Sequence, residues 1–155
     1  GGSTAGLGTQ EERAVFTGSA KVEPVICYES AFGEYHAGYI RSGATLSFIM
    51  SNDGWWGNTA GHLQHLQFAS LRAIETRRSI ARAANTGISA LINQRGDILQ
   101  RTQYETTEAL KGRLQPNDQI TFYVRWGDVI GRLALFIAAI LLLNTFVKSR
   151  IPAKD

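Results

Sequence analysis

The segment Pro-Val-Ile-Cys-Tyr-Glu-Ser, residues 24–30, contains the one cysteine of the chain, Cys27, at the end of a short apolar run. A cysteine can serve as a nucleophile, as a metal ligand or as a small buried side chain. His36, His62 and His65 have no ligand spacing relative to Cys27, which does not favour a metal site. One cysteine forms no internal disulfide and leaves the redox compartment undecided. Cysteine usage alone favours a buried side chain, so the other motifs must decide whether Cys27 is a nucleophile.

The composition bounds the kind of protein. The chain has 155 residues and is 44% hydrophobic, which is enough for one ordinary core. Its net charge of +3 is scattered without a run of like charges and gives no support for a nucleic-acid partner. The N-terminus lacks a basic region followed by an apolar run, so no signal peptide is predicted. Because it starts with Gly-Gly-Ser-Thr and no methionine, we expect a piece of a longer protein.

The elements around Cys27 predict an α/β arrangement. Residues 22–28 are rich in β-branched and aromatic types and predict a buried strand that ends near Cys27. Residues 32–42 predict a short helix closed by Gly43, and residues 44–53 predict a second strand. In such folds, functional sites gather at the carboxyl ends of the strands.

The loop at residues 51–61 joins a polar trio, Ser51, Asn52 and Asp53, to two tryptophans, Trp55 and Trp56. Paired tryptophans next to glycines are large apolar groups that need an apolar surface to contact. They either pack on the following helix, or they form a wall for an apolar substrate or a contact with a membrane surface. The sequence leaves both readings open.

The rest of the α/β part reads as one long helix, a hairpin and a final strand. Apolar residues at spacings of three, four and seven predict a helix over residues 62–85, with Glu75 paired to Arg72 and Arg78. His65 would lie in its polar first turn. A hairpin over residues 86–102 would turn at Gly96, and residues 119–124 predict a last strand.

The C-terminal segment has the character of a membrane helix. Nineteen residues lie between Asp128 and Lys148, and a helix of that length spans roughly 28 Å, close to a bilayer core. The uninterrupted apolar run is only 133–143, a length that alone would suit a buried soluble helix. The flanking residues favour a span: aromatic Tyr123 and Trp126, the snorkelling Arg132, and a basic end with Lys148, Arg150 and Lys154. We therefore predict a membrane helix over 128–148 and a basic cytoplasmic tail over 149–155.

Five motifs together resemble the nitrilase superfamily, and within it the apolipoprotein N-acyltransferases, bacterial enzymes that add the last acyl chain to lipoproteins. The motifs are PVICYES, SNDGWWGNT, QHLQFASLRAIETRRSIARAANTGIS, QRGD and YVRWGDVIGR. Their wording is most similar to versions from Bacteroidetes. The resemblance implies that residues 1–127 are the C-terminal portion of a nitrilase-like α-β-β-α sandwich, followed by the transmembrane helix.

The resemblance also implies the site. Cys27 matches the nucleophile of a Glu-Lys-Cys triad, with Glu29 as a supporting carboxylate and Tyr28 offering its backbone N–H to the oxyanion. The substrate-binding residues would be Trp55, Trp56, Asn52 and Asp53. In the family the general-base Glu and the Lys precede the cysteine by a longer stretch, and Glu11, Glu12 and Lys21 are too close to Cys27 to match them. The chain alone would then be catalytically incomplete.

The resemblance further implies what the protein acts on. A phospholipid would donate an acyl chain through a Cys27 thioester to the N-terminal amine of a diacylglyceryl-cysteine apolipoprotein, with no cofactor or metal. The enzyme would lie in the bacterial inner membrane with its catalytic part facing the periplasm. Two alternatives remain open: a nitrilase-family amidase, which would not need the membrane helix, and a non-catalytic membrane-anchored relative.

Overall fold

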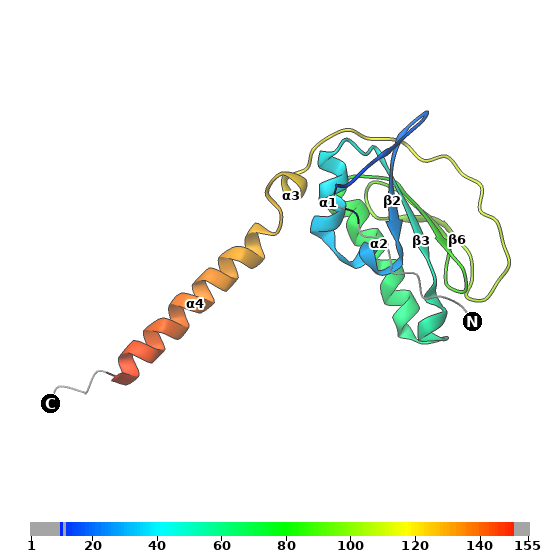
Figure 1. Cartoon of the computed structure of the whole chain (residues 1–155). Helices are drawn as coiled ribbons and strands as arrows, with labels where there is room; N and C mark the ends of the chain where they lie inside the picture. Colours follow the sequence, from blue (N-terminus) through cyan, green and yellow to red (C-terminus); the bar gives the residue numbers. More distant parts are fainter. Residues whose placement is uncertain (1–9, 11, 151–155) are drawn as a thin grey trace, which may run out of the picture.

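A mixed β-sheet forms the centre of the α/β part (Figure 1). The structure is a computed structural model that describes residues 10 and 12–150. The described strands follow one another across the sheet in the order of the sequence. They are β1 Phe16–Thr17, β2 Lys21–Ile26, β3 Leu46–Ser51, β4 Ile80–Ala84, β5 Ala90–Ile92 and β6 Ile98–Arg101. The central strands β2, β3 and β4 are parallel, while β1, β5 and β6 pair antiparallel to their neighbours.

Helices connect the parallel strands, as their direction requires. Between these strands lie α1 Gly33–Arg41 and α2 Ala60–Thr76, with the 3-10 turns η1 Cys27–Ala31 and η2 Asp53–Trp56. The short α3 Phe122–Trp126 and the long α4 Val129–Arg150 follow β6. The predicted strand, helix and strand around Cys27 are confirmed by β2, α1 and β3. The predicted hairpin is confirmed by β5 and β6, with Gly96 at φ +85° in its turn.

One face of the sheet packs on helix α2. Val25 and Ile49 from neighbouring strands are buried together with Leu66, Ala69 and Ala73 of the helix. The register of β2 on β3 pairs Val25 with Ile49 and Ile26 with Met50. This register brings the turn that follows β2 next to the loop that follows β3, so the two segments that carry Cys27 and Asp53 start side by side.

The opposite face of the sheet is open among the described residues. Phe48 and Met50 of β3 are 42% and 48% exposed. A groove of about 540 Å³ runs over this face. Its lining is mostly apolar and includes Phe16, Pro24, Phe48, Met50, Ala81, Ala83 and Leu91, with residues 108–110 of the long segment after β6 at its border. A sheet with an apolar face of this size is one that normally packs on a second layer.

The expected long helix over residues 62–85 is wrong in its last third. Helix α2 ends at Thr76 because Arg77 adopts the left-handed conformation, at φ +53° and ψ +39°. Residues 80–84 instead form β4, which pairs with β3 from Ser47 to Ser51. The Arg72–Glu75 ion pair is confirmed at 3.1 Å. Arg78 is buried and donates to the carbonyl oxygens of residues 44, 76 and 119 rather than to Glu75.

The expected last strand over residues 119–124 is also wrong. Residues 122–126 form the short helix α3, whose first turn is capped by the Thr121 hydroxyl, 3.1 Å from the Val124 nitrogen. Val124 is fully buried against Tyr39 and Ile40 of the α1 region. This packing and the cap outweigh the strand preference of the β-branched and aromatic residues.

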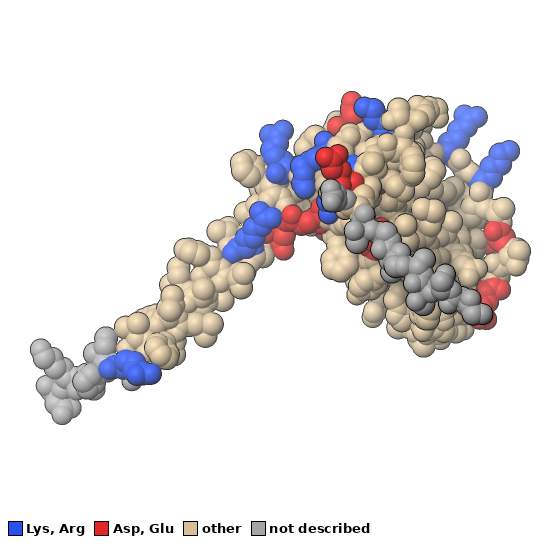
Figure 2. Space-filling view, in the orientation of Figure 1, with Lys and Arg blue, Asp and Glu red and all other residues tan. Residues whose placement is uncertain are grey.

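Helix α4 extends away from the α/β part as a single rod (Figure 1). Within the described residues it is the one helix long and apolar enough to cross a membrane, over Val129–Lys148 with a mean hydropathy of 2.1 and none of the window buried. Figure 2 shows its shaft without charged side chains between basic groups at its two ends. At the end near the α/β part, Arg132 contacts Glu34 of α1 at 2.6 Å. The predicted tail beyond Arg150, including Lys154, lies outside the described residues.

Candidate active site

Cys27 lies on a sharp turn directly after β2. It begins the 3-10 turn η1 with φ +50°, a conformation that costs a residue with a side chain about 1–3 kcal/mol. The thiol is free and partly exposed. Its sulfur lies 3.6 Å from the Ser51 hydroxyl and 3.9 Å from the Asn52 carbonyl oxygen. A strained, partly exposed thiol at the carboxyl edge of a parallel sheet is not packed in the core, and its role as a nucleophile stays a prediction.

Glu29 holds this turn in shape. One carboxylate oxygen accepts a hydrogen bond from the Ile26 backbone N–H at 2.7 Å, and the other accepts one from the Tyr35 hydroxyl at 2.8 Å. Burial, together with hydrogen bonds to Tyr39 and Glu29, raises the pKa of Tyr35 well above its usual value, so the hydroxyl stays a donor. One oxygen of Glu29 therefore stabilises the backbone next to Cys27, and the other binds a side chain of α1. The supporting role of Glu29 in catalysis stays a prediction.

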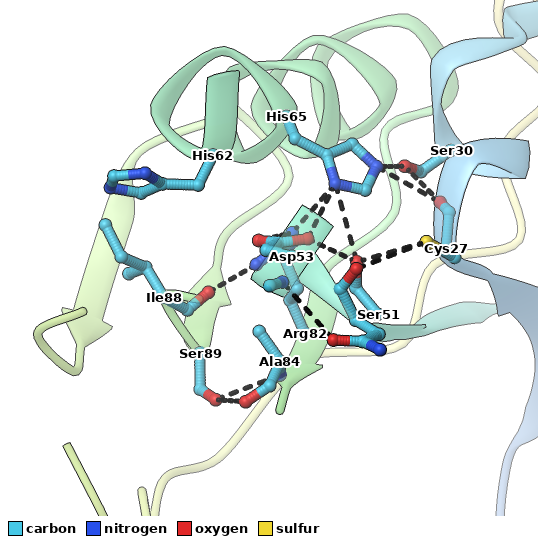
Figure 3. Close-up of polar contacts among 12 residues, drawn as sticks. Cys27, Ser30, Ser51, Asp53, His62, His65, Arg82, Ala84, Ile88 and Ser89 are labelled. Atoms are coloured by element: carbon cyan, nitrogen blue, oxygen red, sulfur yellow. Dashed lines mark hydrogen bonds and ion pairs between the residues drawn. The ribbon is translucent and has the colours of Figure 1, made fainter. Parts of the chain in front are cut away.

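A buried polar network lies under the turn (Figure 3). His65 of α2 places its Nε2 atom 2.9 Å from the Ser30 hydroxyl and 3.2 Å from the Cys27 carbonyl oxygen. Its Nδ1 atom lies 2.9 Å from Asp53. The other Asp53 oxygen accepts from Arg82 of β4 at 2.7 Å. The network thus ties three separate elements to the residue that carries the thiol.

Asp53 is ionised in this network. Burial favours the neutral acid, but hydrogen bonds from His65, Ser51 and Arg82 and the charge of Arg82 outweigh it and hold the pKa of Asp53 far below its usual range. The side chains of Asp53 and Arg82 are both fully buried. A substrate contact of Asp53 stays a prediction, and its burial favours an indirect role.

The two tryptophans have different places. Trp56 packs edge-on against the His65 ring with centroids 4.9 Å apart, whereas the Trp55 side chain is 82% exposed. Packing on the next helix therefore describes Trp56, whereas the Trp55 side chain is open to solvent. The substrate contacts predicted for the two tryptophans stay predictions. The Asn52 side chain accepts from the Gly54 N–H at 3.2 Å and caps η2. Its role toward a substrate stays a prediction.

Exposed apolar residues lie next to Cys27 along the chain. Ile26, Tyr28 and Phe32 come from the strand end and turn that carry Cys27 and are all more than half exposed. Tyr28 and Phe32 form an edge-to-face pair with centroids 5.8 Å apart. Such a surface suits an apolar acyl chain better than a small polar amide. The role of the Tyr28 backbone N–H as an oxyanion donor stays a prediction.

The structure separates Lys21 from Cys27. Lys21 begins β2 and Cys27 follows its end, so six residues of extended chain hold them roughly 20 Å apart. Glu11 lies outside the described residues. In the part of the chain that the structure describes, the recorded partners of the Cys27 sulfur are Ser51 and Asn52, and neither is a base.

Sequence reasoning missed His65 and Arg82 as parts of the site. His65 was assigned to a polar helix turn, and Arg82 to a helix that is a strand. An alternating strand pattern over residues 80–84 would have placed Arg82 beside Ile49 on the sheet and under the carboxyl edge.

Comparison with known proteins gives the family. Residues 3–121 match the carbon-nitrogen hydrolase family. The apolipoprotein N-acyltransferase of Geobacter metallireducens is 33% identical over 138 residues, which cover 89% of this chain and 26% of the relative. The apolipoprotein N-acyltransferase of Nitrosomonas europaea is 42% identical over 103 residues, 66% of this chain and 20% of the relative. The chain thus spans about a quarter or less of these curated relatives.

Solved structures agree in fold. Saccharomyces cerevisiae Nit3, a member of branch 10 of the nitrilase superfamily, has a TM-score of 0.54 at 20% identity, covering 65% of this chain and 40% of Nit3. A Nesterenkonia amidase with acrylamide added at its active-site cysteine has a TM-score of 0.55 at 18% identity, covering 83% of this chain and 50% of the amidase. Together with the matched residues 3–121, these findings show that the chain belongs to the carbon-nitrogen hydrolase family of the nitrilase superfamily and is similar to its apolipoprotein N-acyltransferases.

Proposed function

We propose that this chain is the nucleophile-bearing C-terminal part of an apolipoprotein N-acyltransferase. The observation that carries the proposal is the strained turn with Cys27, which has exposed apolar residues next to it along the chain and belongs to a domain that continues into a candidate membrane span. A thioester formed on such a thiol would lie in apolar surroundings. An amine can then compete with water for the acyl group.

The reaction would proceed in two steps. An ordinary thiol has a pKa of about 8.5 and is mostly protonated at neutral pH, so a general base must take the proton of Cys27. The thiolate attacks an acyl ester of a phospholipid, the carbon–oxygen bond breaks, and the lysophospholipid leaves with a proton. The α-amine of the diacylglyceryl-cysteine then attacks the thioester, forming the amide and returning the thiol.

Each step passes through a tetrahedral oxyanion. The Tyr28 backbone N–H would donate to it from the residue after the nucleophile, and the Lys of the family triad would add a positive charge. Loss of one such donor costs about 2.7–4 kcal/mol in the transition state. We infer that this Lys and the general-base Glu come from outside the 155 residues, since Lys21 lies at the far end of β2.

The open sheet face supports the same inference. In an α-β-β-α sandwich, this apolar face with Phe48 and Met50 would pack on the second sheet, which the described residues do not contain. The chain alone is then expected to be inactive. Helix α4 would cross the bacterial inner membrane, with the basic end at Lys148 and Arg150 on the cytoplasmic side and the α/β part in the periplasm.

A family amidase is the second candidate, favoured by the shared fold with the Nesterenkonia amidase. It uses the same kind of cysteine but gives no reason for the exposed apolar residues next to Cys27 or for α4. The two candidates differ in the acyl donor, which is a phospholipid ester in one case and an amide in the other.

Mass spectrometry of the native, membrane-extracted protein after exposure to phospholipid tests the proposal. We expect a hydroxylamine-labile acyl adduct on Cys27, which disappears after addition of a diacylglyceryl-cysteine peptide. In Cys27→Ala the adduct should be absent, which controls for nonspecific acylation. Wild-type protein that is never acylated by phospholipid, but is acylated by simple amides, would establish the amidase instead.

A further inference from the structure

His65 connects the buried Asp53–Arg82 ion pair to the backbone of Cys27. Its side chain is 1% exposed, and Figure 3 shows the ring lying between the Asp53 carboxylate and the turn that carries the thiol. The Nε2 atom is 3.2 Å from the Cys27 carbonyl oxygen, while the Nδ1 atom is 2.9 Å from Asp53. Among the described residues, the polar contacts of the Cys27 sulfur are with Ser51 and Asn52 and not with the His65 ring. An effect of His65 on the thiol must therefore pass through the turn.

The hydrogen-bond partners of the ring determine what it can do. A carbonyl oxygen only accepts, so Nε2 must donate to bond to Cys27. Nδ1 lies within 3.4 Å of polar atoms of Asp53, Arg82 and Ser51. The Ser30 hydroxyl donates to the same Cys27 carbonyl at 2.8 Å, and its oxygen then accepts from Nε2–H. The carbonyl of the residue at φ +50° is therefore held by two donors.

The ring itself is held in place from two further sides. Arg82 fixes the carboxylate that orients Nδ1, at 2.7 Å from Asp53. Trp56 packs edge-on against the ring at a centroid distance of 4.9 Å and an interplanar angle of 63°. A side chain fixed by packing and by a second shell of hydrogen bonds is what keeps a reacting group in one geometry.

We propose that His65 is a positioning residue for the Cys27 nucleophile, an inference that rests on the proposed acyl transfer. By holding the Cys27 carbonyl, it sets the peptide plane between Cys27 and Tyr28. That plane fixes the direction of the Tyr28 N–H, the proposed oxyanion donor, and constrains the backbone from which the thiol projects. Since His65 touches no substrate, its loss should reduce the rate of acylation at saturating phospholipid without changing the concentration needed for half saturation.

Two conservative variants separate positioning from a role in stability alone. The amide nitrogen of a glutamine reaches the place of Nε2, and that of an asparagine reaches the place of Nδ1. His65→Gln therefore keeps a donor to the Cys27 carbonyl. His65→Asn keeps the hydrogen bond to Asp53 and loses the one to the Cys27 carbonyl. The positioning role predicts that His65→Asn slows Cys27 acylation about 10- to 100-fold and that His65→Gln slows it clearly less.

His62 provides the matched control. It lies on the same helix and is also buried, but its ring points away from Cys27 (Figure 3). The His62 ring packs on Tyr104 at a centroid distance of 4.4 Å. His62→Asn and His62→Gln should leave the acylation rate within about twofold of wild type. Thermal unfolding of all four variants shows whether each one is folded under the assay conditions.

The experiment measures two rates in the native, membrane-extracted protein: single-turnover acylation of Cys27 by phospholipid, and alkylation of the Cys27 thiol by iodoacetamide. Alkylation needs no acyl transfer, so its rate reports the position of the thiol independently of the proposed function. Both rates should fall in the order wild type, His65→Gln, His65→Asn. Equal losses in the two His65 variants, or a larger loss in His65→Gln, would overturn the positioning role. Wild-type protein that is never acylated, while alkylation keeps the predicted order, would overturn the acyltransferase and leave the positioning role standing.

Discussion

The Asp53 carboxylate and the Arg82 guanidinium meet at 2.7 Å, and both side chains are completely buried. The pair joins the loop after β3 to strand β4 directly beneath the thiol-bearing turn. Replacing Arg82 by methionine leaves the Asp53 charge buried without its cation. We expect Arg82→Met to lower the free energy of unfolding by about 3–5 kcal/mol, measured by denaturant unfolding in detergent micelles.

The surface pair Arg95–Asp97 is the control for this change. Its side chains are 78% and 55% exposed, at an N–O distance of 3.0 Å. Arg95→Met should change the free energy of unfolding by less than about 1 kcal/mol, because water screens an exposed pair. Equal effects of Arg82→Met and Arg95→Met would show that the buried pair does not stabilise the fold.

Asp53 should also make stability depend on pH. Its pKa is held below the usual value of 3.8 because the hydrogen bonds and the Arg82 charge outweigh burial. A carboxylate with a depressed folded-state pKa stabilises the protein above its unfolded pKa, and that stabilisation is lost as the pH falls toward the folded pKa. Between about pH 5 and pH 3, the free energy of unfolding should therefore fall more in wild type than in Asp53→Asn. Parallel pH curves for the two proteins would contradict this assignment.

The strain at Cys27 predicts an unusual preference between glycine and alanine. At φ +50° an L side chain is disfavoured, whereas glycine is not. Cys27→Gly should therefore be more stable than Cys27→Ala by about 1 kcal/mol. At Gln67, an exposed position inside α2, the order should reverse by a similar amount, about 1 kcal/mol, because alanine favours a helix. Alanine being the more stable substitution at both positions would show that the turn is not strained. The measurement is denaturant unfolding of the four variants.

The elements around Cys27 could be predicted because their signals are local. β2 and β3 are short apolar runs, and α1 ends before Gly43, which adopts φ +95°. Strand β4 was hidden because Ile80 and Ala84 continue the apolar spacing of α2, and alanine and arginine favour helices. Pairing with β3, which lies far away in the sequence, decides its conformation. Local propensity does not contain that information.

The site shows the same division. The sequence shows a cysteine, Cys27, at the end of a predicted strand, and a carboxylate, Glu29, two residues later. The network beneath Cys27 is not visible in the sequence, because Asp53, His65 and Arg82 lie on three elements and meet only when β4 is placed correctly. The difference between Trp55 and Trp56 was equally hidden. Adjacent residues of the same type take opposite environments once η2 turns the chain.

Helix α4 provides a test of the membrane assignment through one residue at its centre. Ile137 is 54% exposed on the rod, so an aspartate there is not buried against the described part of the chain. In a bilayer, Ile137→Asp should raise the apparent free energy of insertion of α4 by about 2.5–3.5 kcal/mol. Leu99→Asp on strand β6, at a leucine that is 53% exposed, should leave insertion unchanged. Glycosylation sites placed on either side of α4 in the complete protein report the inserted fraction in microsomes. If wild-type α4 is never inserted, the helix does not span the membrane and the amidase becomes the better account of the function. If wild type and Ile137→Asp insert equally well, Ile137 does not lie in the hydrocarbon core.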